Sequence, residues 1–126
     1  MTDEFKNPNG CRIKSTWFAT VDYTVPDLAK KYVDGGHELA CHTVHHTADP
    51  DIDEIFDCRR RFEGLFNKDG NRSVVVSGFR TPDLLYTPRT FEALSQVGFL
   101  YDSTLVEQAG SPFSPNPSSK VRFMLP

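Results

Sequence analysis

Long hydrophobic runs are missing from this sequence of 126 residues, and so is a basic amino terminus. No stretch approaches the ~20 apolar residues that a membrane-spanning helix needs. The first residues, Met1-Thr2-Asp3-Glu4, are acidic where a secretory signal peptide would be basic, and no apolar segment follows them. We therefore predict neither a membrane span nor a signal peptide. The localisation stays open, because the chain either is intracellular or begins inside a longer protein.

Positive charge is also scarce, since 14 Lys and Arg residues stand against 17 Asp and Glu residues and the net charge is −3. A protein that binds nucleic acid or an anionic membrane usually carries a basic patch. The dense basic run here, Arg59-Arg60-Arg61, lies in a predicted helix that is otherwise rich in acidic residues, as expected of a solvated face. We predict that neither nucleic acid nor a membrane is a partner.

Cysteine is limited to Cys11, Cys41 and Cys58. An odd number argues against a complete disulfide framework. One disulfide with one free thiol and three free thiols fit the count equally well. The chain length suffices for one hydrophobic core, so we predict a single domain over residues 1–126.

The hydrophobic pattern predicts strands and helices in alternation. The predicted strands cover residues 14–20, 38–41, 74–76 and 99–105, and a partial strand at 121–125 follows a Pro- and Ser-rich loop at 110–119. The predicted helices cover residues 26–34, 50–68 and 88–97. We expect Thr24 to cap the first helix, Asp49 to cap the second, and Gly98 to end the third.

This alternation with short connections predicts parallel strands and right-handed crossovers, hence an α/β fold. A Rossmann-like sheet and a (β/α) barrel, or an arc of one, both fit the order of elements. Dinucleotide binding has no support, because no G-x-G-x-x-G follows the first strand. In both folds the active or binding site lies at the carboxyl ends of the strands, and His42, Arg80 and Asp102 fall at or just after such ends.

Three of the four histidines lie within five residues, as His42, His45 and His46. Because His42 and His46 are four positions apart, one helical turn or a tight loop brings their imidazoles together. Imidazole binds zinc and other late first-row divalent ions, and two histidines leave room for a carboxylate and water. His45 points away from this pair. The alternative is a polar loop with chance histidines.

Four segments resemble motifs of the polysaccharide deacetylase family, and its chitin-deacetylase-like members in particular. Residues 36–46, GHELACHTVHH, resemble the family's G-H-E and H-(S/T)-x-x-H pattern. Residues 78–82, GFRTP, resemble its R-x-P motif, and residues 99–104, FLYDST, resemble its Y-D-S-(S/T) strand. Residues 7–18 resemble the approach to its second strand. The order and spacing of these motifs make the resemblance far more specific than the histidines alone.

The resemblance implies a partial (β/α) barrel of the polysaccharide deacetylase type, from a family that hydrolyses N-acetyl groups of acetamido-sugar polymers such as chitin. It implies that His42 and His46 bind a divalent metal ion, zinc or cobalt, and that Thr43 stabilises the histidine loop. It implies that Arg80 orients the catalytic carboxylate and that a carbohydrate polymer is the partner. Members of the family are often secreted, in which case Cys11 and Cys58 are candidates for a disulfide.

The family's paired aspartates and its carboxyl-terminal histidine have no counterpart that we accept in these 126 residues. The resemblance then implies a domain truncated at both ends, without its base, its acid and its third metal ligand. We expect a metal-dependent hydrolase that is weak or inactive as this chain. The alternatives are a non-catalytic carbohydrate-binding remnant and a small structural metal protein.

Overall fold

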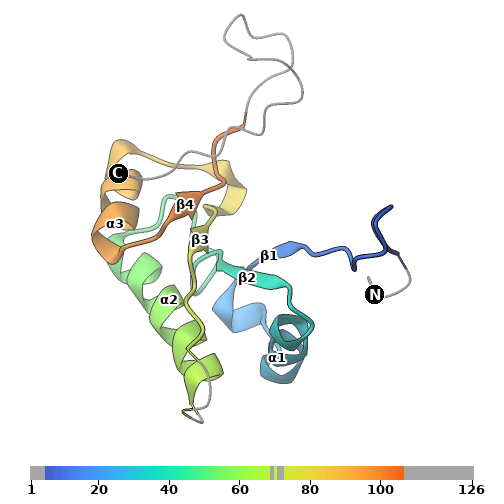
Figure 1. Ribbon diagram of the computed structural model, residues 1–126. Helices are drawn as coiled ribbons and strands as arrows, with labels where there is room; N and C mark the ends of the chain where they lie inside the picture. Colours follow the sequence, from blue (N-terminus) through green and yellow to red (C-terminus); the bar gives the residue numbers. More distant parts are fainter. Residues whose placement is uncertain (1–4, 69, 71–72, 107–126) are drawn as a thin grey trace, which may run out of the picture.

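The computed structural model describes residues 5–68, 70 and 73–106, and its centre is a four-stranded sheet (Figure 1). The strands follow the order β1-β2-β3-β4, and each neighbouring pair is parallel. The strands are β1 (Thr16–Ala19), β2 (Glu38–Cys41), β3 (Gly78–Phe79) and β4 (Tyr101–Asp102). Parallel neighbours need a crossover connection, and each connection here contains a helix. The prediction of an α/β fold with parallel strands alternating with helices is confirmed.

Three α-helices and two short 3-10 helices make up the connections in the described part of the chain. They are η1 (Val21–Tyr23), α1 (Pro26–Asp34), α2 (Ile52–Asn67), η2 (Pro82–Leu84) and α3 (Pro88–Val97). α2 packs against α3, and α1 contacts β2, as Figure 1 shows. No helix in the described ranges has both the length and the apolarity to cross a bilayer. The predicted loop at 110–119 and strand at 121–125 lie outside these ranges.

The bounds of the first and third helices agree with the prediction, but the cap of the first does not. The cap position of α1 is Val25, and the Thr24 hydroxyl instead donates to the Thr20 carbonyl at 2.6 Å. The prediction of a Thr24 cap was therefore wrong. α3 ends as predicted at Gly98, whose φ of 86° is the left-handed conformation that glycine adopts without a steric penalty.

The second helix begins two residues later than predicted. Its cap is Asp51, whose carboxylate accepts from the Glu54 backbone N–H at 2.9 Å. Asp49, the predicted cap, has a φ of 45° and accepts from the Thr90 hydroxyl of α3 at 3.1 Å. Both aspartates have side chains suited to a helix cap, and the contact with α3 decides between them.

The strand predicted at residues 74–76 is wrong, because the backbone groups of this segment bond to side chains of α2. Val74 exchanges two hydrogen bonds with the Asn67 side chain, at 2.7 and 2.9 Å. The Val76 N–H donates to the Glu63 carboxylate at 3.1 Å. These bonds satisfy backbone groups that would otherwise bond to a neighbouring strand. In this part of the chain, strand pairing begins only at β3.

The hydrophobic core lies between the sheet and its helices. Its large, fully buried side chains include Ile55, Phe62, Phe79 and Leu94, and Cys41 and Cys58 are buried among them. Cys11 is exposed on the segment before β1. The described structure leaves Cys11 and Cys58 as free thiols in these different surroundings, so the pairing that the resemblance allowed is not formed.

Candidate functional site at the carboxyl edge of the sheet

Three polar residues directly follow consecutive strands at one edge of the sheet. They are His42 after β2, Arg80 after β3 and Ser103 after β4. The backbone N–H of each donates to the carbonyl of the last residue of the preceding strand, at 2.9 to 3.0 Å. The sheet thus continues by one hydrogen bond at each strand end and holds these residues side by side. In parallel α/β folds, active and binding sites lie at this edge.

The His42 ring is oriented by the backbone of the next strand. Its Nδ1 lies 2.7 Å from the Arg80 carbonyl oxygen. Because a carbonyl only accepts, Nδ1 carries the proton and Nε2 keeps its lone pair. The side chain is half-buried, and desolvation lowers the pKa of His42 below 6.5, although the bond to Arg80 acts in the opposite direction. The ring is therefore neutral at pH 7, the form that binds metal.

His46 faces His42 across a tight turn. The two ring centroids are 5.0 Å apart and the ring planes meet at 74°. Thr43 and His46 both have positive φ, 67° and 64°, which reverses the chain within a few residues. Thr43 is fully buried, and its hydroxyl accepts from the Thr47 N–H at 3.1 Å. The loop thus brings the exposed His46 imidazole back toward the half-buried His42 imidazole.

His45 is turned away from this pair, as predicted from its position. Its Nδ1 lies 2.5 Å from a carboxylate oxygen of Asp22, and its Nε2 lies 3.8 Å from Glu54. Glu54 also accepts from the Val44 N–H at 2.8 Å and the Thr47 hydroxyl at 3.0 Å. The first turn of α2 therefore holds the histidine loop, a role of Glu54 that we did not predict. A carboxylate in the first turn of a helix is favourable on its own, so the sequence did not indicate that Glu54 contacts the histidine loop.

The Arg80 guanidinium is fixed by β4 and β1. Its Nε donates to the Ser103 carbonyl at 3.0 Å and an Nη donates to the Ser103 hydroxyl at 2.6 Å. The guanidinium carbon lies 4.5 Å from the centroid of the Phe18 ring, a cation–π contact. Among the residues that the structure describes (5–68, 70 and 73–106), no carboxylate forms a salt bridge with Arg80.

Asp102 is only 8% exposed and ties β4 to the residues that follow it. Its carboxylate accepts from the Thr104 N–H at 2.8 Å and the Thr104 hydroxyl at 2.6 Å. The same hydroxyl accepts from the Thr81 N–H at 2.9 Å. Desolvation raises the pKa of Asp102 above 3.8, against the opposing effect of the bonds from Thr104. This network indicates a structural hydrogen-bonding role for Asp102.

We expect the Asp102 carboxyl to titrate above 3.8, as measured by NMR of its carbonyl carbon. The folded protein binds this proton more tightly than the unfolded chain does. The free energy of unfolding, compared with that of an Asp102→Asn variant, should therefore be greatest below pH 3.8 and fall as the pH rises through the folded pKa. A midpoint at or below 3.8 would contradict the desolvation argument.

The described residues do not assemble a complete set of metal ligands. Within the ranges that the structure covers, no group of three or more His, Cys, Asp or Glu side chains is placed to hold one ion. His42 and His46 come together as predicted, whereas the Asp22 carboxylate is engaged with His45 and the Glu54 carboxylate accepts from the Val44 N–H. The site supplies two imidazoles and a nearby guanidinium.

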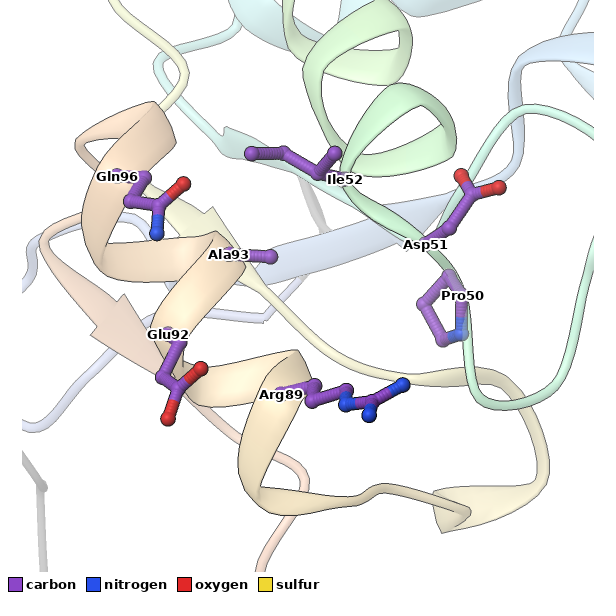
Figure 2. Close-up of a pocket in the computed structure, with 7 residues that line it drawn as sticks. All are labelled: Pro50, Asp51, Ile52, Arg89, Glu92, Ala93 and Gln96. Atoms are coloured by element: carbon purple, nitrogen blue, oxygen red, sulfur yellow. The ribbon is translucent and has the colours of Figure 1, made fainter.

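A cavity of about 310 Å³ lies elsewhere, between the start of α2 and α3 (Figure 2). It is lined by Pro50, Asp51, Ile52, Arg89, Glu92, Ala93 and Gln96. Figure 2 shows Arg89 extending from α3 toward Pro50. None of the strand-end residues lines this cavity, so we place the chemistry at the sheet edge and not in the helix layer.

Comparison with known proteins supports the class that the fold and the motifs define, a polysaccharide deacetylase-like α/β protein. No family model matches the chain. Chitin deacetylase 1 of Bombyx mori is 32% identical to it over 117 residues, which cover 85% of this chain and 21% of the relative. The chain thus spans about a fifth of the length of this relative.

Solved structures share the fold at low identity. A CE4 family pseudoenzyme from Bacillus anthracis has a TM-score of 0.55 and 20% identity, over 69% of this chain and 32% of that one. The Xyl-CE4 domain of a multidomain xylanase from the hindgut metagenome of Trinervitermes trinervoides has a TM-score of 0.50 and 19% identity, over 64% and 41%. With the deacetylase relative, they identify the chain as a polysaccharide deacetylase-like segment.

Proposed function

We propose that residues 1–126 form one partial domain of a metal-dependent hydrolase that removes N-acetyl groups from an acetamido-sugar polymer such as chitin. The observation that carries the proposal is the orientation of His42. Its Nδ1 is bound to the Arg80 carbonyl, so its Nε2 is available beside the His46 ring. Two imidazoles at the carboxyl edge of a parallel sheet, in a chain related to a chitin deacetylase, fit that chemistry.

His42 and His46 would hold a divalent metal ion, zinc or cobalt, through their ring nitrogens. The neutral His42 ring and the backbone bond on its other nitrogen are what a metal-binding histidine requires. A bound ion of this kind lowers the pKa of water and polarises a carbonyl oxygen. Thr43 would keep the loop in the turn that aligns the two rings, through its bond to Thr47.

Arg80 would orient the carboxylate that acts as the base. Its guanidinium is already aligned by Ser103 and Phe18, so little side-chain freedom remains to be lost when a carboxylate binds. A guanidinium can hold a carboxylate through two parallel hydrogen bonds. Because we find neither the base nor the acid among the residues of this chain, we expect it to be weak or inactive alone.

The test is acetate release from an acetylated chitooligosaccharide, with zinc or cobalt added to the purified chain. We expect release close to the uncatalysed rate. Any release above the uncatalysed rate should depend on metal and be lost in Arg80→Ala, because a mispositioned reacting group lowers rates by about 100-fold. An Arg89→Ala variant, changed at an exposed arginine of α3, is the matched control. Release that survives both removal of metal and Arg80→Ala would contradict the proposed site.

A non-catalytic carbohydrate-binding protein is the second candidate. The incomplete ligand set in the described ranges favours it. Retention of the chain on chitin beads that is unchanged when metal is removed, without acetate release, would support this candidate over the metal-dependent hydrolase. Failure to bind chitin and to release acetate would contradict both.

A further inference from the structure

Two cysteines of the core lie on elements that pack against each other. Cys41 is the last residue of β2, and Cys58 lies in the first half of α2. Both side chains are fully buried, with a relative exposure of 0%, and both belong to the same hydrophobic cluster. α2 and β2 are in direct contact. The two thiols therefore occupy one interior region, although they are far apart in the sequence.

The two thiols also interact. Burial and the neighbouring Cys58 thiol both raise the pKa of Cys41. The third thiol, Cys11, is exposed and lies before β1 on a short segment where Lys6 pairs with Arg12 in an isolated bridge. Since a disulfide requires Cβ atoms roughly 3.5–4.5 Å apart, a pair buried in one core cluster on packed elements needs only a small adjustment. A pair with one exposed member and one fully buried member needs a larger one.

We propose that Cys41 and Cys58 form an internal disulfide when the folded protein is equilibrated with an oxidising low-molecular-weight disulfide such as oxidised glutathione. One cysteine sulfur attacks the glutathione disulfide, forming a mixed disulfide and releasing one glutathione thiol. The second cysteine sulfur then attacks the mixed disulfide, forming the Cys41–Cys58 bond and releasing the second glutathione. The protein gives up two electrons and two protons, and both are recovered in the two reduced glutathiones.

The bond would link the end of β2 to α2, and the histidine loop lies within the segment that it closes. It closes a loop of about 17 residues, for which constraint of the unfolded chain is expected to stabilise the fold. The residue after Cys41 is His42, so the linkage anchors the strand end that carries this ring. Because both thiols are fully buried, the oxidant reaches them only when β2 and α2 separate locally.

The test uses a Cys11→Ser variant, which leaves the buried pair intact and removes the competing thiol. After equilibration in oxidising glutathione buffer without denaturant, free thiols are alkylated and peptides are mapped by mass spectrometry. We expect a single disulfide that joins the Cys41 and Cys58 peptides, and a rise in Tm of roughly 10 °C over the reduced protein. Wild type should show the same linkage, with Cys11 free or bound to glutathione.

Cys41→Ala and Cys58→Ala are the matched controls, and each should abolish the linkage. Because both cysteines are fully buried, either substitution can lower stability, and the wild-type peptide map keeps the test independent of them. A wild-type internal disulfide that joins Cys11 to Cys41 or Cys58, the absence of any internal disulfide in Cys11→Ser, or a fall in Tm on oxidation would each overturn the proposal. None of these results depends on metal binding or deacetylation, so failure here is separate from failure of the proposed function.

Discussion

Zinc or cobalt added to the purified chain is expected to bind through His42 and His46, and His42→Ala and His46→Ala should each lower the affinity at least tenfold. A tenfold loss corresponds to about 1.4 kcal/mol of binding free energy. The physical reason is that His42 presents an oriented, neutral ring whose free nitrogen lies beside His46. Isothermal titration calorimetry on the metal-free protein measures these affinities directly.

His45→Ala is the matched control for this prediction. His45 lies between the two candidate ligands in the sequence, but its ring is engaged with Asp22. Its removal should leave the metal affinity within about twofold of wild type. Equal losses in all three variants would mean that the loop merely unfolds, and no loss in any variant would mean that the metal binds elsewhere.

Phe62→Ala is expected to destabilise the fold by about 3–5 kcal/mol, as measured by urea unfolding. Phe62 is 2% exposed on α2 and stacks near Phe66, with ring centroids 6.3 Å apart. Removing the ring leaves a cavity in the core between α2 and the sheet. Small domains have only roughly 5–15 kcal/mol of total stability, so a large unfolded fraction is expected.

Phe56→Ala makes the same chemical change on the same helix, but Phe56 is 51% exposed. It should change the free energy of unfolding by less than about 1 kcal/mol. Similar losses for Phe56→Ala and Phe62→Ala would show that α2 is not packed as described. The comparison removes helix propensity as an explanation, because both variants replace phenylalanine by alanine within α2.

Local patterns predicted most of the regular structure. The bounds of α1 and β2 agree with the prediction residue for residue, and the Gly98 stop of α3 is confirmed. These elements follow from apolar spacing and from Pro and Gly at their ends, which act over a few residues. The placement of His42 at the end of a strand followed from the same patterns, whereas Arg80 follows β3, which begins after the strand that was predicted.

Two predictions failed where a side chain of another element replaced a local partner. The strand expected at 74–76 is irregular because Asn67 and Glu63 of α2 take up its backbone groups. The second helix starts late because Asp49 bonds to Thr90. Periodicity in one segment carries no information about which residue of another segment will meet it.

The sequence by itself determined the α/β class, the alternation of strands and helices, and the pairing of His42 with His46, because these depend on residues close together in the chain. Only the tertiary structure decided which atoms of these residues are engaged in contacts and which remain available to bind a ligand. It engages His42 Nδ1 with the Arg80 carbonyl, aligns Arg80 through Ser103, and buries Cys41 and Cys58 in one core cluster while Cys11 lies exposed. Such contacts join elements distant in sequence, and they form because strands pair side by side and α2 packs against the sheet.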